Sequence, residues 1–284
     1  MHDDDESRVV TIVGAGVMGT AIATTVLHQG VSVHLIDSDD KVIAQAPERV
    51  SRQLRHAQLM GAPSAAPAPG TLTTSNSVDP QVSLSRAVIE AIVEDADLKQ
   101  KVLADVVELV EPGTPLISNT SGIPIDELAG RLVRPEDLVG THFMNPAYLI
   151  DMVEVIRGPR TSESILAATT DLLMSFGRKP VVVRDSPGFV TSRLLHPMIN
   201  EASRIVGDGI ASAEDVDALM QGCLGHPTGP LRTADLIGID NLVDALRALY
   251  ERTGQSYFEP STALLEKVQQ GDLGRKTGRG FYEY

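Results

Sequence analysis

The chain has 284 residues, of which 42% are apolar, and its formal net charge at pH 7 is −14. This length and apolar content suffice for one large core or two smaller ones, and they exclude a disordered or fibrous chain. The acidic balance argues against nucleic acid as a partner, because such binding needs clustered Lys and Arg that displace counterions. Cys223 is the only cysteine, so no intramolecular disulfide can form, and a buried structural thiol is expected.

The start of the chain, MHDDDESR, is acidic where a signal peptide would be basic. No apolar run approaches the ~18 residues of a membrane span. We therefore expect a cytoplasmic protein with no membrane partner.

Short apolar runs alternate with helix-like stretches from the first residues onward. A β-branched run at 9–13 leads through GAGVMG into a helical stretch at 20–30, and a second strand is expected at 31–37. Residues 41–60 continue as a helix despite one internal proline, whereas the Gly and Pro residues of 61–70 predict a loop.

The same alternation continues along the next hundred residues. A helix is expected over 95–110, and further strands are expected in five short runs, at 87–93, 114–118, 138–143, 151–156 and 179–183. Strands that alternate with helices in this way predict an α/β fold, with a doubly wound, mainly parallel sheet of the Rossmann type.

After Pro187 the apolar residues recur at helical spacing, and no run is typical of a strand. Four helices are expected there, at 192–206, 213–224, 241–254 and 262–271. We therefore place a domain boundary near residue 186. Residues 1–186 are expected to form the Rossmann domain and residues 187–284 an all-helical domain.

Gly14, Gly16 and Gly19 form a G-x-G-x-x-G motif between the first strand and the first helix. The first glycine permits a tight turn, the second lets the backbone approach a pyrophosphate, and the third lets the helix pack on the strand. The N-terminus of that helix, with Val17 and Met18, offers N–H groups and a positive dipole end to the pyrophosphate. The motif in this context predicts a dinucleotide site.

Asp37 ends the second predicted strand, 18 residues after Gly19. A carboxylate at this position accepts hydrogen bonds from both ribose hydroxyls and repels a 2′-phosphate. This favours NAD over NADP as the cofactor. On these residues alone a flavin remains an alternative.

His142 lies at the end of a predicted strand, where a doubly wound sheet binds its ligands. Glu154 follows within the next strand, flanked by Val153 and Val155, and a carboxylate there is costly to bury without a partner. The turn-like NPAYLI segment between the strands would bring Glu154 back to the imidazole. Such a carboxylate fixes the histidine tautomer and leaves the other ring nitrogen free to take a proton from a hydroxyl. A strand-end histidine by itself is more often structural.

Several motifs in fixed order resemble the 3-hydroxyacyl-CoA dehydrogenase family over nearly the whole chain. They are VGAGVMG, VIEAIVED, SNTSGIPI, GTHFMNP, MVEVIRG, DSPGFV, HPTGPLRTADLIGIDN and GRKTGRGFYEY. The resemblance implies a catalytic dyad of His142 and Glu154, with Ser121 bonded to the reacting hydroxyl and Asn145 beside the dyad and the nicotinamide. It further implies cofactor contacts at Ala91, Glu94, Lys99, Asn119 and Lys276. The residues alone would favour plain surface charges for Glu94 and Lys99, and a basic tail for Lys276.

The resemblance also implies a reaction, the oxidation of the 3-hydroxyl of a short 3-hydroxyacyl thioester by NAD. Hydride leaves C3 of the substrate for C4 of the nicotinamide, while His142 removes the hydroxyl proton and Ser121 supports the developing charge on oxygen. No metal is required. Relatives dimerise through the helical domain, so a homodimer and a substrate-binding role for residues 187–284 are expected.

The chain departs from the family pattern in the region expected to bind the substrate. Ser192 replaces an Asn that is expected to help hold the substrate carbonyl oxygens, and His196 replaces an aliphatic residue. Serine is shorter and offers a single rotatable donor, so a water bridges the gap or the substrate differs. His196 is compatible both with contact to the acyl chain and with a packing role.

Residues 55–70 are a larger departure, because HAQLMGAPSAAPAPG replaces a Lys-rich extension that contacts the CoA nucleotide in relatives. A phosphopantetheine arm on an acyl carrier protein presents only one phosphodiester and needs fewer cations than CoA. Arg49, Arg52 and Arg55 could serve either partner. An alternative is thus a dehydrogenase for a carrier-bound hydroxyacyl or glyceryl group, as in polyketide pathways.

Two further alternatives remain, one from another class of protein and one from another group of dehydrogenases. A non-catalytic structural protein could retain the fold, as some crystallins do, but the intact His142, Glu154 and Ser121 oppose this. A 3-hydroxyacid dehydrogenase has a similar glycine motif but would be expected to rely on a Lys general acid.

We predict a large preference for NAD over NADP, because the Asp37 carboxylate accepts ribose hydroxyls and repels a phosphate at the same position. Steady-state kinetics with each cofactor measures this preference directly. Equal kcat/KM for the two cofactors would contradict the role given to Asp37.

Overall fold

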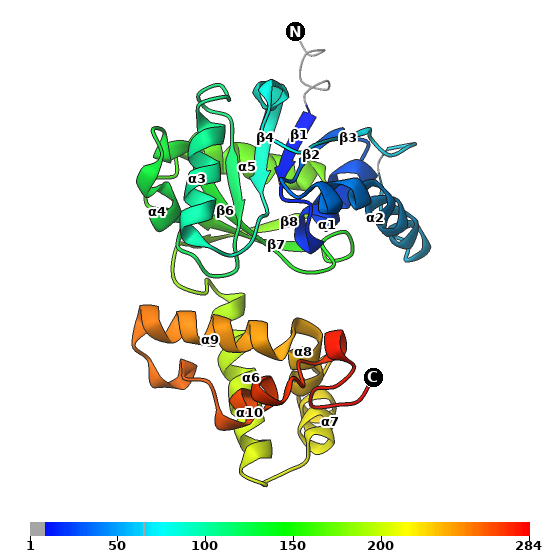
Figure 1. Cartoon of the computed structure of the whole chain (residues 1–284), viewed down its shortest axis with the longest axis vertical. Coiled ribbons are helices and arrows are strands. Elements are labelled where there is room, and N and C mark those ends of the chain that lie inside the picture. The colour runs from blue at the N-terminus through cyan, green and yellow to red at the C-terminus, as the bar shows by residue number, and fades with distance from the viewer. Residues whose placement is uncertain (1–8, 65) are drawn as a thin grey trace. The chain divides into compact units, whose positions relative to one another are not determined.

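A computed structural model describes residues 9–64 and 66–284 and divides the chain into two compact units. The first unit ends at Asp185 and contains the sheet, and the second runs from Ser186 to Tyr284 and is built of helices (Figure 1). The expected order of an α/β fold followed by an all-helical part is confirmed. No helix among the described residues is long and apolar enough to cross a membrane.

The first unit is organised around one eight-stranded sheet, in the order β3-β2-β1-β4-β5-β6-β7-β8. The strands are β1 Val9–Val13, β2 Val33–Ile36, β3 Leu72–Ser75, β4 Ser85–Glu90, β5 Leu116–Asn119, β6 Leu138–Phe143, β7 Met152–Arg157 and β8 Lys179–Arg184. All neighbours are parallel except β6 and β7, which run antiparallel. The chain leaves β1 toward β2 and later returns to pair β4 with its other side, which creates the switch point where Rossmann folds bind nucleotides.

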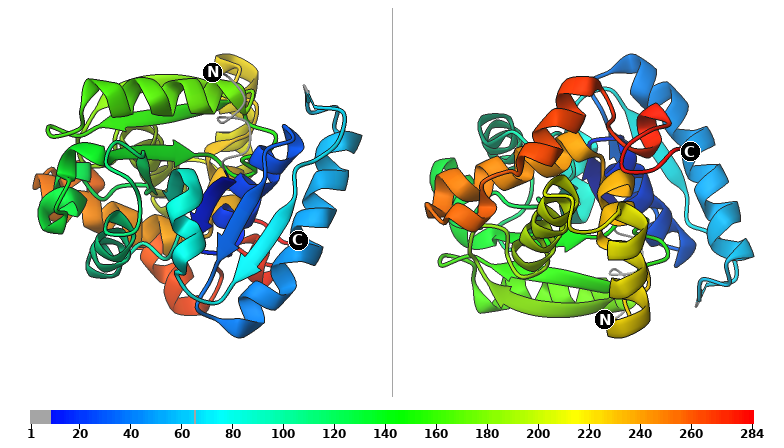
Figure 2. Two further views of the ribbon diagram at one scale, coloured as in Figure 1. Left: turned by 90° about the horizontal axis from the view of Figure 1, so that it is seen from above. Right: turned by 90° about the horizontal axis from the view of Figure 1, so that it is seen from below.

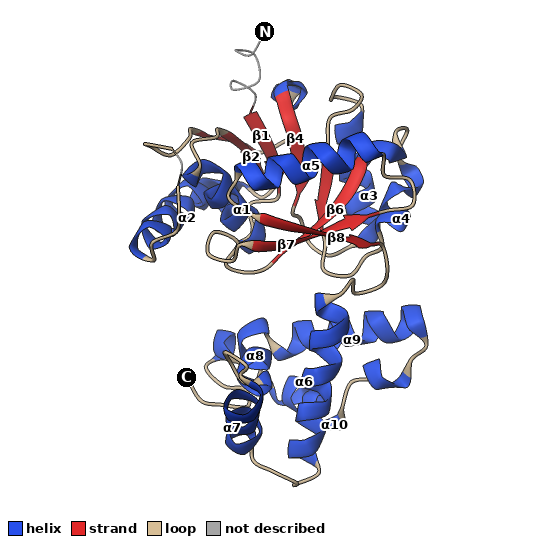
Figure 3. Ribbon diagram, turned by 180° about the vertical axis from the view of Figure 1, so that it is seen from behind, coloured by secondary structure: helices blue, strands red, loops and turns tan. Residues whose placement is uncertain are grey.

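Five helices cover the two faces of this sheet. They are α1 Val17–His28, α2 Asp40–Leu59, α3 Ala96–Val107, α4 Ile125–Leu128 and α5 Glu163–Ser175. The buried sides of α1, α2 and α5 pack with alternate residues of the strands into one apolar cluster. Figure 3 shows α5 in front of the sheet and α3 and α4 behind it. Strands that are buried on both faces have nearly continuous apolar sequences. Most strands of this sheet can therefore be predicted from the sequence.

The segment 61–70, predicted as a loop, forms no helix or strand at its described residues and folds back on the end of α1. Its contacts there are specific. The Ser64 hydroxyl donates to the His28 carbonyl at 2.6 Å, Gly70 N–H donates to Leu27 O at 2.8 Å, and Gln29 Nε2 donates to Pro63 O at 2.8 Å. Residue 65 lies outside the described residues. The chain therefore reverses at the end of α2 instead of extending that helix.

The second unit contains five helices around its own apolar clusters. Figure 2 shows these helices from two further sides, coloured from yellow-green to red. They are α6 Thr191–Gly207, α7 Ala213–Leu224, α8 Pro230–Ile237, α9 Ile239–Thr253 and α10 Thr262–Gln270. Two buried carboxylates organise them. Asp217 of α7 accepts from the N–H groups of Leu231 and Arg232 in the first turn of α8, and Asp235 accepts from Phe281 and Tyr282 of the C-terminal tail.

Several predicted elements differ from those observed. The sequence pattern does not predict β3, which is a short, mostly polar strand, or α8, which begins with Pro230 at its first helical position. Helix α1 begins at Val17, three residues before the predicted start. The expectation that Cys223 is buried is wrong, because it lies on an exposed position of α7.

Candidate active site

The glycine motif forms the tight turn between β1 and α1. Gly14 has φ +106°, and a Cβ there would lie 2.5 Å from the carbonyl oxygen of Ala91. A Cβ on Gly19 would lie 1.7 Å from the carbonyl oxygen of Gly14. Both glycines are therefore required for close approach of backbone to backbone. A Cβ on Gly16, in contrast, would meet no described atom within 4 Å.

This geometry fits the pyrophosphate of a dinucleotide. Gly16 leaves open space at the N-terminus of α1, and no described side chain caps that terminus. Val17 is exposed and Met18 partly exposed on the first turn of the helix. The backbone N–H groups and the positive end of the α1 dipole can therefore hold the phosphates of NAD.

Asp37, directly after β2, is fixed beside the glycine turn by two backbone hydrogen bonds. Its Oδ2 accepts from Ala15 N–H at 2.7 Å and its Oδ1 accepts from Asp39 N–H at 2.9 Å. The Arg49 guanidinium of α2 donates to the Ala15 carbonyl at 3.0 Å. The carboxylate thus stands at the carboxyl end of β2, where a ribose would lie in this fold.

His142 and Glu154 face one another across the antiparallel pair of β6 and β7. They are direct register partners, and His142 Nδ1 lies 2.8 Å from Glu154 Oε2. Both side chains are 8% exposed. An ionised carboxylate only accepts hydrogen bonds, so Nδ1 carries the proton in the neutral imidazole and the lone pair lies on Nε2. The pair can therefore act as an oriented general base.

Three polar residues lie at the ends of β5 and β6 or just after them, at the same edge of the sheet. The Asn119 side-chain oxygen accepts from Phe143 N–H at 3.1 Å, which ties the end of β5 to the end of β6. Ser121 is exposed in the turn after β5, and Asn145 is exposed after β6. The structure thus brings Asn119, Ser121 and Asn145 to the edge where the strand of His142 ends.

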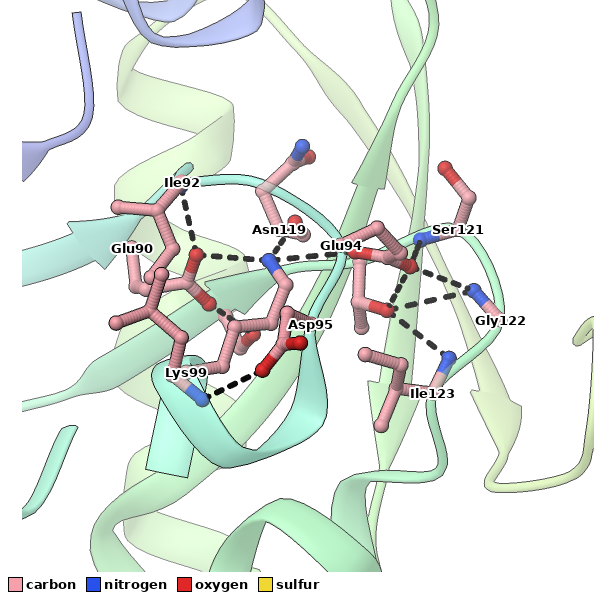
Figure 4. Close-up of polar contacts among 12 residues, drawn as sticks. Glu90, Ile92, Glu94, Asp95, Lys99, Asn119, Ser121, Gly122 and Ile123 are labelled. Carbon is pink, nitrogen blue, oxygen red and sulfur yellow. Dashed lines mark hydrogen bonds and ion pairs between the residues drawn. The ribbon is translucent and has the colours of Figure 1, made fainter. Parts of the chain in front are cut away.

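Lys99 is not the surface charge that the residues alone favour, because its side chain is 0% exposed. Its ammonium lies among Glu90, Glu94 and the Asn119 carbonyl, at 2.7, 3.3 and 3.1 Å respectively (Figure 4). Glu94, part of the same group, is exposed. Ala91 is buried and donates its N–H to Val13 O at 2.7 Å, so it lines the glycine turn.

Glu90 is not among the site residues expected from the sequence, although it is the last residue of β4 and is buried. Burial raises the pKa of this carboxyl group, and the neighbouring Lys99 opposes that rise. The available signal was a Glu within an apolar strand, VIEAIV, which is the same signal that identified Glu154. Ser118 and Thr120, which also contact this group, carried no signal of their own.

Three of the expected site residues belong to the second unit. Ser192 and His196 lie four residues apart on α6, and both are buried. Lys276 lies in a short 3-10 turn, Arg275–Thr277, and forms a 2.5 Å ion pair with Asp240. This contact lowers the pKa of Asp240 against the opposing effect of its burial. Lys276 is therefore part of an ordered pair and not of a loose basic tail.

A glycine turn that fits a dinucleotide, on the same sheet as a histidine held by a carboxylate, defines a nucleotide-dependent dehydrogenase. Residues 9–186 match the family described as "3-hydroxyacyl-CoA dehydrogenase, NAD binding domain", and residues 188–284 match its C-terminal domain. The chain belongs to the 3-hydroxyacyl-CoA dehydrogenase family. It is thus an NAD-dependent oxidoreductase that oxidises a 3-hydroxyacyl thioester.

Relatives match over almost their whole length. The chain is 37% identical to a probable 3-hydroxybutyryl-CoA dehydrogenase of Bacillus subtilis, with 98% of each chain covered. It is 33% identical to the mitochondrial hydroxyacyl-coenzyme A dehydrogenase of Sus scrofa, with 97% of this chain and 90% of the other covered. The crystal structure of (S)-3-hydroxybutyryl-CoA dehydrogenase from Ralstonia eutropha superposes with a TM-score of 0.88 at 36% identity, covering 98% of this chain and 99% of the other.

The unequal surroundings of two motif glycines predict different effects of adding one methyl group. Gly16→Ala should lower NAD affinity about tenfold or more with little change in melting temperature, because its Cβ enters open space beside the pyrophosphate position. Gly19→Ala should lower both, because its Cβ collides with backbone. NAD titration and thermal melting of the two variants measure this difference. Wild-type NAD affinity in Gly16→Ala would show that the pyrophosphate does not approach this glycine.

Proposed function

We propose that the chain oxidises short 3-hydroxyacyl-CoA esters to 3-oxoacyl-CoA esters, with His142 as the general base. The observation that carries this proposal is the buried 2.8 Å contact between His142 Nδ1 and Glu154. The short acyl chain is supported by relatives named 3-hydroxybutyryl-CoA dehydrogenase.

In the proposed reaction, His142 Nε2 takes the proton of the 3-hydroxyl group. Glu154 holds the ring in the tautomer that leaves Nε2 unprotonated, and it stabilises the imidazolium that forms. Bound NAD supplies the acceptor for the hydride that leaves C3. The Ser121 hydroxyl donates to the substrate oxygen as that oxygen loses its proton, and Asn145 orients the reacting groups beside the dyad.

The cofactor and the acyl group have separate proposed contacts. The cofactor is held by the glycine turn, by Asp37 and by a further set of residues, namely Ala91, Glu94, Lys99, Asn119 and Lys276. Ser192 and His196 of α6 are proposed to contact the substrate. Their burial and their spacing of one helical turn support a common contact, because residues four apart share one face of a helix.

The proposed dyad predicts a large loss of turnover when its histidine is replaced. His142→Gln should lower kcat roughly 10²–10⁴-fold with nearly unchanged NAD affinity, because general-base catalysis is lost while the nucleotide contacts remain. Glu154→Gln should act in the same direction but less severely. His34→Gln is the matched control, because His34 is also buried, lies on β2 and pairs with Asp79. Wild-type turnover of His142→Gln at neutral pH would refute the dyad.

The loop that follows α2 predicts weak recognition of the CoA nucleotide. Residues 56–70 contain no Lys or Arg, and the Arg49 and Arg55 side chains already contact Ala15 and Ser51. We expect pantetheine or carrier-bound 3-hydroxyacyl substrates to compete well with the CoA ester, because each lost charge-assisted phosphate contact costs about 1.5–3 kcal/mol.

The deciding measurement is kcat/KM for one acyl group on CoA, on pantetheine and on an acyl carrier protein. A CoA ester better than the pantetheine ester by ~100-fold, about 2.7 kcal/mol, would show that the nucleotide is held firmly. A carrier-bound substrate that exceeds both would favour the second candidate, a dehydrogenase of carrier-bound groups. The absence of cations in residues 56–70 is the observation that supports that candidate.

We also propose a cytoplasmic homodimer that assembles through the helical unit. Exposed apolar side chains on the neighbouring helices α7 and α8, namely Leu219, Leu224 and Leu236, support a self-association surface. Light scattering should give twice the monomer mass, and Leu219→Lys with Leu224→Lys should shift the mass toward the monomer. A monomeric wild-type protein at micromolar concentration would exclude the dimer.

A further inference from the structure

A buried group of charges lies beneath the turn that carries Ser121. Glu90 ends β4 with a side chain that is 1% exposed, and Lys99 of α3 is 0% exposed. Removing such charges from water is costly, so each must be compensated by close partners. Neither the family resemblance nor the proposed reaction gives Glu90 a role.

The Glu90 carboxylate is fully engaged with protein donors. Its Oε1 accepts from Lys99 Nζ at 2.7 Å and from Ile92 N–H at 2.8 Å, and its Oε2 accepts from the Ser118 hydroxyl at 2.5 Å. The contacts with Lys99 and Ile92 are drawn in Figure 4. Glu90 is therefore the anchor of the Lys99 ammonium.

The Lys99 ammonium has three N–H donors and three acceptors around it. The acceptors are Glu90 at 2.7 Å, the Asn119 carbonyl at 3.1 Å and Glu94 Oε2 at 3.3 Å. The shortest contact is to Glu90, so Glu94 shares the cation without being drawn fully toward it. This leaves the other oxygen of Glu94 for the turn after β5.

Glu94 Oε1 holds that turn through three donors. It accepts from the Thr120 hydroxyl at 2.5 Å, from Ser121 N–H at 2.7 Å and from Gly122 N–H at 3.3 Å. Thr120 Oγ1 in turn accepts from Ile123 N–H at 3.0 Å. The position of Ser121 therefore depends on the position of the Glu94 carboxylate.

We propose that Glu90 is a positioning residue for this reaction, acting through Lys99 and Glu94 on the turn that carries Ser121. The inference rests on the proposed role of Ser121. Without the negative charge of Glu90, Glu94 is the only carboxylate of the described residues that still pairs with Lys99, and the ammonium draws it away from the Ser121 and Gly122 amides. A displacement of about 1 Å in a reacting group costs up to 10²-fold in rate.

The test compares Glu90→Gln with Glu108→Gln, which removes an exposed carboxylate at the end of α3. In Glu90→Gln, kcat for a 3-hydroxybutyryl ester should fall about 10- to 100-fold, and amide hydrogen exchange at Ser121 and Gly122 should accelerate at least tenfold. Glu108→Gln should change neither quantity. Unchanged exchange and unchanged kcat in Glu90→Gln would overturn the proposal.

A double variant separates positioning from a general structural role. In Glu90→Gln/Lys99→Gln the unbalanced cation is gone, so Glu94 is no longer drawn away and exchange at Ser121 should return toward the wild-type rate. If Glu90 only stabilised the fold, the Ser121 amide would exchange faster in the double variant than in Glu90→Gln. That result would overturn the proposal. If Glu90→Gln does not fold, the double variant is compared with Lys99→Gln. Equal kcat supports action through Lys99, and a further loss overturns it.

The exchange measurement needs no substrate, so it is independent of the proposed reaction. Faster exchange with unchanged kcat is resolved by Ser121→Ala. If Ser121→Ala lowers kcat, the inference about Glu90 is overturned, because the loosened turn still serves the reaction. If Ser121→Ala also leaves kcat unchanged, the role proposed for Ser121 is the one that fails, and the inference that rests on it is overturned with it.

Discussion

The reversal of the chain between β6 and β7 is the constraint on which the proposed catalytic pair depends. Only residues 144–151 join these strands, which is too short for the crossover that a parallel neighbour requires. The strands therefore pair antiparallel, and the pairing sets His142 opposite Glu154. A carboxylate from the third residue of β7 thus meets an imidazole from the penultimate residue of β6, and no loop has to hold either of them.

The rest of the first unit is arranged so that other strand ends reach the same edge. Parallel order from β3 to β6 brings the glycine turn after β1, Glu90 at the end of β4 and Asn119 at the end of β5 to the side where β6 ends. The link from the Asn119 side chain to Phe143 N–H joins two of these ends. Rigid strand ends of this kind place reacting groups more accurately than mobile loops do.

Buried charge has two different functions in the proposals made for this unit. The Glu154 carboxylate contacts the histidine proposed as the general base, whereas the Glu90 carboxylate neutralises the Lys99 ammonium, which also contacts the Glu94 carboxylate that holds a turn. Replacing a buried ion pair by apolar side chains often stabilises a protein, so stability alone does not explain Glu90 and Lys99. Positioning of the turn after β5 gives these two charges a reason to be present.

The sequence alone determined the local features, because they depend on near neighbours along the chain. Three features could be predicted in this way: the glycine motif between a β-branched run and a helix, the strand ends at Asp37 and His142, and the change to helices after Pro187. Glu154 could be assigned to His142 because a short link leaves few possible partners for its carboxylate.

Only the tertiary structure decided which charged and polar side chains are removed from water. Lys99 reads as a surface charge at a helix start, yet it is buried because α3 packs on the ends of β4 and β5. Glu90 also lies between apolar residues, as Glu154 does, but its ion-pair partner Lys99 comes from the following helix, so no strand pairing pointed to it. Cys223 lies exposed on α7, and the polar β3 is a strand because β2 offers it an edge. Burial and pairing depend on which elements meet in space, and a sequence pattern reports only the periodicity within each element.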